Sequence, residues 1–262
     1  MLNKKRLQSI LPVGRLGEVF RYYNRIGSTN EVALEMAQTG AQDGTLVIAD
    51  EQTAGRGRAG RTWSTPAGSA VAMSLVLKPE NLAAKSAGEL TVLGALAVVE
   101  ALEAHGVAAK IKWPNDVLLS GGKAAGVLVE NGWMEDKLLY TVMGIGINVH
   151  AASIQNLEQF DFPAACLEDE LMERVDRTEL IKDVLTVLDE RYAQLGSGSH
   201  MTAWNDKLAY RGESVTVQGA GMNSTGKLVG VSENGQLRLQ LVTGEVLQIG
   251  VGGQHLRPVD KI

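Results

Sequence analysis

The stretch that decides how this chain folds around a ligand is residues 52–63, QTAGRGRAGRTW. Within it, residues 55–61 hold three glycines and three arginines. Glycine lets the backbone approach a ligand closely and reach positive φ, and arginine offers a planar fork of donors for carboxylate or phosphate. We therefore predict an anion-binding loop that is flexible when empty and ordered by its ligand. The alternative interpretation is a solvated turn or a patch that binds RNA.

The composition indicates a folded chain with one large domain, or one domain and a small module, because 45% of its 262 residues are hydrophobic and 21% are charged. The net charge of −5 argues against general nucleic-acid binding, which favours a basic domain. The single Cys166 cannot form an internal disulfide, as expected in a reducing cytosol. No apolar run approaches a membrane span of roughly 20 residues and no export signal is present. We therefore expect a cytoplasmic protein.

The segments on either side of the loop predict strands. Residues 45–49 form a short apolar run that leads into the loop, and residues 69–77 form the next one. A loop between two strands differs from a P-loop, which would carry Gly-Lys-Ser/Thr and open a helix.

A helix start is predicted at Ser28, because Glu31 follows it at the spacing of a capping box. The helix should extend to about Gln38, and its first amides would suit an anion. The alternative is that Ser28 and Thr29 only cap the helix.

A second polar stretch is KWPND, residues 112–116. Residues 109–113 alternate as a strand should, and Pro114 then breaks the ladder. This bend would bring Asn115 and Asp116 into a site, where an amide and a carboxylate can hold a cation or a hydroxyl. The alternative is a plain turn, because these residue types dominate turns.

Two further strands carry signs of a site. Lys123 begins an apolar strand, where a lysine either marks the strand end or meets a charged ligand group. Gly144 and Gly146 interrupt a second strand over residues 138–149. Glycine inside a strand often marks close approach by a ligand or another backbone.

The remaining segments predict helices at residues 83–105, 177–195 and 202–208, followed by a change of character near residue 211. From there on, short alternating strands are punctuated by glycine, with a hairpin signal at Asn234-Gly235. We expect a small β-barrel or sandwich after the boundary near Tyr210.

Five motifs together resemble the bacterial biotin–protein ligases, in the order and at the spacing of that family. They are Ser28-Thr29-Asn30, Gln52 with residues 55–63, KWPND at 112–116, KAAG at 123–126 and GIGIN at 144–148. The resemblance covers about residues 26 to 150, and residues 211–259 fit the family's SH3-like domain. It implies an α+β fold, namely a mixed sheet with helices on one face (catalytic domain, 1–210) followed by a small SH3-like β-barrel (211–262).

The resemblance implies an ATP-dependent ligase that works in two steps. Biotin carboxylate attacks the α-phosphate of ATP, giving biotinyl-5′-AMP and pyrophosphate; a lysine of a biotin carboxyl carrier domain then attacks the mixed anhydride and AMP leaves. Mg²⁺ is expected with ATP, although no side-chain cage for it is predicted. The carrier belongs to a biotin-dependent carboxylase. The resemblance also implies a homodimer, and neither a nucleic-acid nor a membrane partner is expected.

The resemblance assigns two catalytic cations, Lys123 and Arg58. Biotin is assigned to Ser28, Thr29, Asn30, Gln52, Gly55, Arg56, Gly57, Arg58, Lys123, Gly126 and Gly144. ATP and the adenylate are assigned to Arg56, Arg58, Arg61, Trp63, Asn115, Asp116, Lys123 and Asn148. Residue chemistry agrees, because the reaction brings two anions together and makes an intermediate that a closing loop would protect from water.

Three other functions remain as alternatives. A lipoate–protein ligase or octanoyl transferase shares the catalytic fold, but the Gly/Arg loop and KWPND favour biotin. A biotin sensor without turnover would not need Lys123 and both loop arginines, and a nucleic-acid-binding module conflicts with the acidic net charge.

Some family members begin with a winged helix-turn-helix and repress transcription. Here the first motif begins at residue 28, which leaves no room, so we expect no operator binding.

Overall fold

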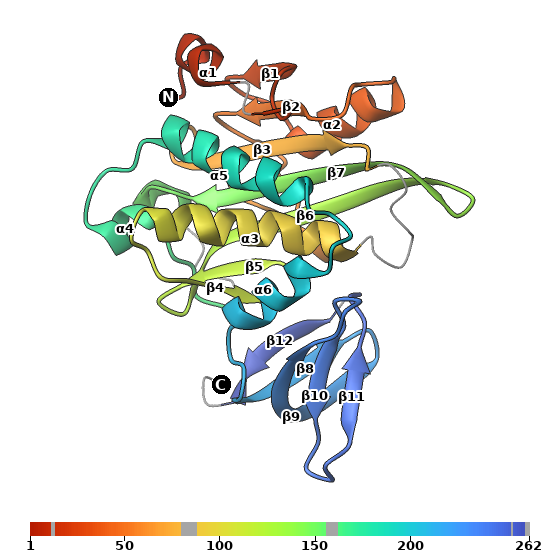
Figure 1. Ribbon diagram of the computed structural model, residues 1–262. Coiled ribbons are helices and arrows are strands. Elements are labelled where there is room, and N and C mark those ends of the chain that lie inside the picture. Colours follow the sequence, from red (N-terminus) through yellow and green to blue (C-terminus); the bar gives the residue numbers. More distant parts are fainter. Residues whose placement is uncertain (12–13, 80–87, 156–161, 253, 260–262) are drawn as a thin grey trace.

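A computed structural model describes residues 1–11, 14–79, 88–155, 162–252 and 254–259 and contains two sheets (Figure 1). The larger sheet has the strand order β1-β2-β3-β7-β6-β5-β4, in which only the β1–β2 pair is parallel. Its strands are β1 (Phe20–Tyr23), β2 (Thr45–Ala49), β3 (Ala70–Leu77), β4 (Ala109–Lys112), β5 (Asp116–Leu119), β6 (Gly122–Met134) and β7 (Lys137–Asn148). The helices are α1 (Lys4–Ile10), α2 (Thr29–Gln38), α3 (Gly88–Ala104), α4 (Leu167–Leu171), α5 (Arg177–Tyr192) and α6 (Ser199–Lys207).

The second sheet is antiparallel throughout and has the order β11-β10-β9-β8-β12. Its strands are β8 (Ser214–Gly219), β9 (Met222–Val231), β10 (Leu237–Gln240), β11 (Val246–Ile249) and β12 (His255–Pro258). These strands begin directly after α6, in the region where alternating residues predict a small β unit. The domain boundary near residue 210 stays a prediction.

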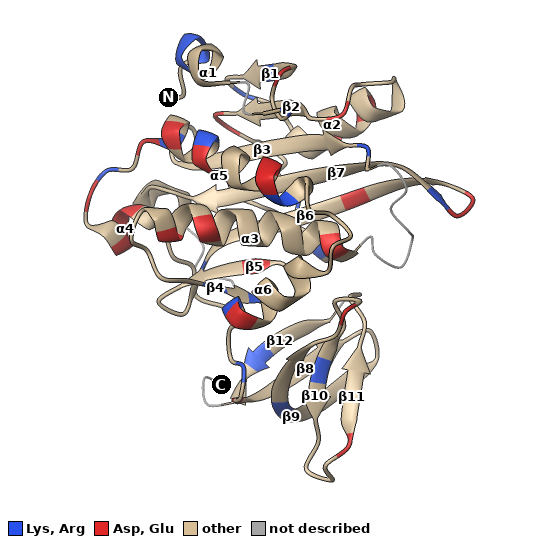
Figure 2. Cartoon of the chain, in the orientation of Figure 1, with Lys and Arg blue, Asp and Glu red and all other residues tan. Residues whose placement is uncertain are grey.

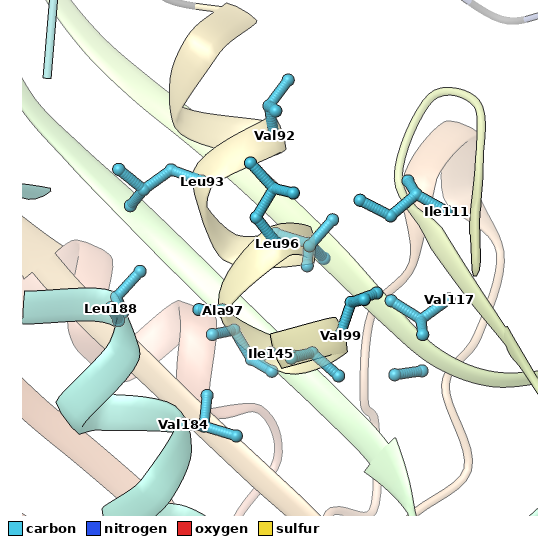
Figure 3. Packing of buried hydrophobic residues seen from close by; sticks show 14 of the residues in the cluster. Val92, Leu93, Leu96, Ala97, Val99, Ile111, Val117, Ile145, Val184 and Leu188 are labelled. Carbon is cyan, nitrogen blue, oxygen red and sulfur yellow. The ribbon is translucent and has the colours of Figure 1, made fainter. Parts of the chain in front are cut away.

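The main core lies between the larger sheet and the pair α3 and α5. Leu96 and Ala97 of α3, Ile145 of β7, and Val184 and Leu188 of α5 belong to one buried cluster (Figure 3). Full burial of such a Leu, Ile or Val stabilises the fold by about 1.5–3 kcal/mol. Because α3 is packed on both sides, its sequence is apolar almost all round.

Helix α2 packs on the opposite face of the sheet. Leu46 and Ile48 of β2 belong to the core beneath α3 and α5, whereas Val47 packs with Ala33 and Ala37 of α2. Alternate residues of a strand point to opposite faces, so β2 is buried on both. Helices α3 and α5 therefore cover one face of the sheet, as expected. Helix α2 is the exception, because it covers the other face. Its N-terminus carries the Ser-Thr-Asn motif.

The predicted start of the helix at Ser28 is found, but the predicted capping-box hydrogen bonds are wrong. Ser28 is the N-cap of α2, but its side chain makes no capping bond. Instead the backbone N–H of Thr29 donates to Gln52 Oε1 at 2.8 Å, so the loop after β2 supplies the acceptor. A glutamine distant in sequence thus satisfies a helix terminus that local spacing had assigned to Ser28 and Glu31.

A buried ion pair lies at the two strand ends that the Gly/Arg loop connects, the end of β2 and the start of β3. The Arg177 guanidinium lies 2.8 Å from Asp50 Oδ1, next to the end of β2, and donates to the carbonyl of Ala70 at 2.9 Å. The N-terminus of α5 therefore ties β2 and β3 together where the loop begins and ends.

The acidic residues of the helical layer recur along α3, α4 and α5 (Figure 2), whereas the arginines of the loop lie between β2 and β3. Among the described residues, no helix combines the length and apolarity that crossing a membrane requires. Residues 83–87 of the predicted second helix lie outside the described residues, and α3 begins at Gly88.

Candidate active site

The predicted site residues converge on one cavity of about 300 Å³. It is lined by Ser28, Thr29, Asn30, Gln52, Arg56, Gly57, Arg58, Arg61, Trp63, Asn115, Asp116, Lys123, Gly126, Gly144 and Asn148. Gly55 is the exception. A Cβ at this position would overlap the carbonyl oxygen of Trp63, so Gly55 serves the close packing of the loop on itself.

The Gly/Arg loop joins β2 to β3 as predicted, and its own backbone bonds shape it. Gly57 N–H donates to the Arg61 carbonyl at 2.7 Å and Trp63 N–H to the Gly55 carbonyl at 2.8 Å. Between them a short 3₁₀ turn, Arg58–Gly60, includes Gly60 at a φ of +73°. The turn exposes the arginine side chains to the cavity. Ordering of the loop by its ligand stays a prediction.

One end of the cavity carries a polar network on the N-terminus of α2. Thr29 Oγ1 lies 3.0 Å from Gln52 Oε1, and Gln52 Nε2 donates to Thr65 Oγ1 at 3.1 Å. Ser74 Oγ lies 2.8 Å from Thr29 Oγ1 and 2.6 Å from Asn30 Oδ1. Such a mixture of donors and acceptors suits a neutral ligand group that both donates and accepts, as a urea does.

A second part of the cavity is organised around the carboxylate of Asp116. Lys123 Nζ lies 2.6 Å from Asp116 Oδ1, and Lys112 Nζ lies 3.4 Å from Oδ2. Burial disfavours the charge of Asp116, but Lys123 and then Lys112 outweigh burial and hold the pKa of this carboxyl below its usual value. Two ammonium groups against one carboxylate leave this region ready for an anion.

Lys112 is buried, with an exposed fraction of 4%, which the alternating strand pattern did not predict. Its Nζ lies 4.5 Å from the centre of the Phe162 ring, in addition to its contact with Asp116. Burial lowers the pKa of Lys112 to about 8, while Asp116 opposes that shift. Lys112 is the last residue of β4 and pairs in register with Asp116 of β5, so its side chain meets that carboxylate in the cavity.

Two asparagines hold the backbone and side chains around these charges. Asn115 donates from Nδ2 to the Val127 carbonyl at 2.8 Å and accepts from Arg58 Nη1 at 3.0 Å. Asn148 Nδ2 donates to the carbonyl of Lys123 at 3.3 Å. The structure therefore places Asn115 against the loop and Asn148 behind the main chain of Lys123.

Glycines form the floor of the cavity. A Cβ at Gly146 would lie 2.5 Å from the Trp63 indole, and one at Gly144 would overlap Asn30 Oδ1. A Cβ at Gly126 would lie 3.4 Å from Lys123 Nζ. The missing side chains at Gly144 and Gly146 let the Asn30 amide and the Trp63 indole pack directly on β7. Close approach by a ligand to these glycines stays a prediction.

Several lining residues were not predicted from the sequence. They are Thr62, Ser64, Ala72, Met73, Lys112, Val127, Leu128, Ile145, Gly146, Phe162, Ala164 and Arg257. Lys112 and Gly146 stand inside motifs that had been singled out, and Val127, Leu128 and Ile145 neighbour predicted residues. Arg257 comes from β12 of the second sheet, and no local pattern marks it.

The arrangement combines an apolar floor, a polar network and several cations in one cavity, which suits an amphipathic anion. Among the described residues, no group of three His, Cys, Asp or Glu side chains could hold a metal ion. The one carboxylate at the centre, Asp116, is already held by two lysines.

Comparisons with known proteins agree on a family. Residues 22–148 match the model of the biotin/lipoate A/B protein ligase family. The bifunctional ligase/repressor BirA of Bacillus subtilis is 34% identical, over 93% of this chain and 76% of the relative. The biotin–[acetyl-CoA-carboxylase] ligase of Paracoccus denitrificans is 37% identical, over 82% of this chain and 92% of the relative.

A solved structure agrees with these relatives. The biotin protein ligase from Aquifex aeolicus in complex with biotin and ATP superimposes with a TM-score of 0.79 at 31% identity, over 92% of this chain and 99% of that one. The expected fold, a mixed sheet with helices followed by a small β unit, is thereby confirmed. This chain belongs to the biotin/lipoate A/B protein ligase family.

Proposed function

We propose that this chain is a biotin protein ligase that activates biotin as biotinyl-5′-AMP and transfers it to a lysine of a carrier domain. The observation that carries the proposal is the convergence of Arg56, Arg58 and Lys123 on one cavity that also holds a polar network. The network suits the ureido ring, and the cations suit a carboxylate beside a triphosphate.

In the first step a biotin carboxylate oxygen attacks the α-phosphorus of ATP, and the bond to pyrophosphate breaks. Lys123 stabilises the charge that builds on the carboxylate and α-phosphate, and Asp116 holds its ammonium group in place at 2.6 Å. Arg58, oriented by Asn115 at 3.0 Å, neutralises the same region from the loop. Neither side chain forms a covalent bond.

In the second step the carrier lysine, as a free amine, attacks the biotinyl carbonyl carbon. A new amide bond forms, the anhydride bond to AMP breaks, and the proton of the amine is released. The Gly/Arg loop protects the adenylate until then, because water would hydrolyse it.

ATP and biotin are the substrates in this proposal, and Mg²⁺ enters with the phosphates of ATP, since it commonly keeps several waters and few protein ligands. The acceptor is a carrier domain of a biotin-dependent carboxylase, and a reducing cytoplasm suits the lone Cys166. A homodimer is part of the proposal by family resemblance.

Operator binding is not part of the proposal. The described residues before Ser28 include one helix, the seven-residue α1. A titration against duplex DNA tests this, and salt-resistant, sequence-specific binding would contradict it.

The central experiment is biotin-dependent exchange of labelled pyrophosphate into ATP, with lipoate and octanoate in parallel. Exchange with biotin alone is the expected result. Exchange with lipoate instead would assign the chain to lipoate activation, and tight biotin binding without exchange would indicate a sensor.

The Lys123→Ala variant should lower the exchange rate on the order of 10²–10³-fold, the usual effect of losing one preorganised charge. Lys207→Ala is the matched control, because Lys207 also pairs with a carboxylate at 2.6 Å, that of Glu103, but does not line the cavity. Near-normal exchange by Lys123→Ala, with biotin at saturation, would remove Lys123 from its role.

A further inference from the structure

We infer that Glu130 of β6 is a positioning residue that couples recognition of the biotin head group to the Gly/Arg loop; this inference rests on the proposed function. Glu130 does not line the cavity itself. Its two carboxylate oxygens serve two different parts of the site. Oε2 accepts from Asn30 Nδ2 at 2.9 Å, and Oε1 accepts from the Arg56 guanidinium.

The first contact sets the orientation of the Asn30 amide. An ionised carboxylate only accepts hydrogen bonds, so the NH₂ group of Asn30 has to face Glu130. The oxygen of the amide then faces Ser74 Oγ, 2.6 Å away, and the space above Gly144. Ser74 alone could not enforce this orientation, because a hydroxyl can either donate or accept.

The second contact positions Arg56. Its side chain comes from the loop and reaches β6, so the loop is attached to the strand that also carries Lys123. Arg56 is about two-fifths exposed and Glu130 about one-quarter, with side-chain exposed fractions of 38% and 24%. Such a partly exposed pair contributes little to the stability of the fold. Its role is therefore to orient Arg56.

The two contacts belong to one continuous network. From Glu130 it passes through Asn30 and Ser74 to Thr29, and from Thr29 to Gln52. Gln52 stands at the start of the loop stretch, and Arg56 lies within it. The network therefore leaves the loop, crosses the head-group pocket and returns to the loop through Glu130. A ligand that orders Asn30 also orders Arg56, because both bind the carboxylate of Glu130. Ordering of Arg56 must in turn order Asn30, since coupling between two sites is reciprocal.

The coupling predicts which kinetic constant responds. Asn30 and Arg56, the two partners of Glu130, are both assigned to biotin, and Arg56 is also assigned to the adenylate. Arg58, bonded to Asn115, and the Lys123–Asp116 pair are held without Glu130. Loss of the Glu130 charge should therefore weaken biotin binding more than ATP binding. A merely structural role would instead lower the active fraction, and hence kcat, and spare both KM values.

Glu130→Gln is the test, because it keeps the size of the side chain but removes the charge and lets the Asn30 amide turn over. In the pyrophosphate exchange assay we expect the KM for biotin to rise about tenfold or more, with the KM for ATP changed less than about twofold, since loss of hydrogen bonds to a charged group commonly has such an effect. An unchanged biotin KM, or equal changes in both constants, would overturn the inference.

Two controls separate coupling from other causes. Glu100→Gln removes the carboxylate that binds Arg191 between α3 and α5, away from the cavity, and should leave both KM values unchanged. Arg56→Gln alone and together with Glu130→Gln completes a double-mutant cycle, in which the effects on biotin KM should be non-additive. Additive effects would contradict a shared role.

The inference also has a test that does not depend on turnover. If the wild-type chain failed to exchange pyrophosphate with biotin, the proposed function would fall. Calorimetric titration of biotin into wild type and Glu130→Gln would still report the coupling, and equal affinities would overturn it separately.

Discussion

At the scale of single residues, the site depends on buried charged groups that are stabilised by neighbouring groups of opposite charge. Lys112 shows this most clearly: its side chain is enclosed beside Phe162 and Asp116. Burial lowers its pKa from 10.5 to about 8, in spite of Asp116. A cation that titrates so near neutrality makes the electrostatics of the cavity depend on pH.

We predict that the KM for ATP rises as the pH passes through about 8, because Lys112 then loses its proton and the cavity loses a positive charge. The measurement is pyrophosphate exchange between pH 7 and 9.5 at saturating biotin, with the pH range chosen to span roughly one unit or more around that pKa. Lys112→Met, in the same buffers, controls for titration of ATP and pyrophosphate and should show a flatter profile. Identical profiles for the two proteins would contradict the prediction.

The same shift has a consequence for stability. Because the folded pKa of Lys112 lies below 10.5, the unfolded chain binds more protons between about pH 8 and 10.5. The buried charge therefore destabilises the fold below about pH 8, and the destabilisation is relieved as the pH rises through this window.

At the scale of elements, the Gly/Arg loop works through what its arginines contact. Arg58 donates to Asn115 Oδ1 at 3.0 Å and to the carbonyl of Gly252, which lies between β11 and β12 of the second sheet. Burial lowers the pKa of its guanidinium, with Asp116 opposing, but arginine stays charged. One side chain thus bridges the loop, the turn after β4 and the second sheet.

We predict that Arg58→Gly releases biotinyl-AMP about 10–100-fold faster, the effect of losing one charged hydrogen-bonding group. The measurement is retention of labelled adenylate by the protein during rapid gel filtration. Arg58→Ala separates loss of the side chain from the added backbone freedom of glycine. Retention that matches the wild type would count against a closing loop.

At the scale of the whole molecule, the second sheet is docked on the first and takes part in the cavity. Trp113 Nε1 donates to the Gly235 carbonyl at 3.1 Å, and Arg257 of β12 lines the cavity. Asn205 of α6 both accepts from the Val231 N–H at 2.9 Å and donates to its carbonyl at 3.2 Å. These contacts hold the second sheet in place beside the cavity.

We predict that Asn205→Ala lowers the free energy of unfolding by about 1–3 kcal/mol, because the Val231 N–H and carbonyl lose their partner in a buried junction. The measurement is urea unfolding followed by fluorescence. Asn223→Ala, at an exposed position of β9, is the control and should change stability by less than about 0.5 kcal/mol. Equal stabilities of the two variants would show that the junction does not depend on Asn205.

The sequence by itself determined the local features of this protein. Hydrophobic alternation and glycine or proline breaks act over a few residues, so they predicted β2, the Gly/Arg loop and the β-rich end of the chain. The motifs likewise predicted just over half of the residues that line the cavity. Only the tertiary structure decided how distant groups meet: Gln52 at the N-terminus of α2, Glu130 between Asn30 and Arg56, and Arg257 beside Lys112. Such pairings depend on strand order and on the docking of two sheets, which bring together residues that no short pattern connects.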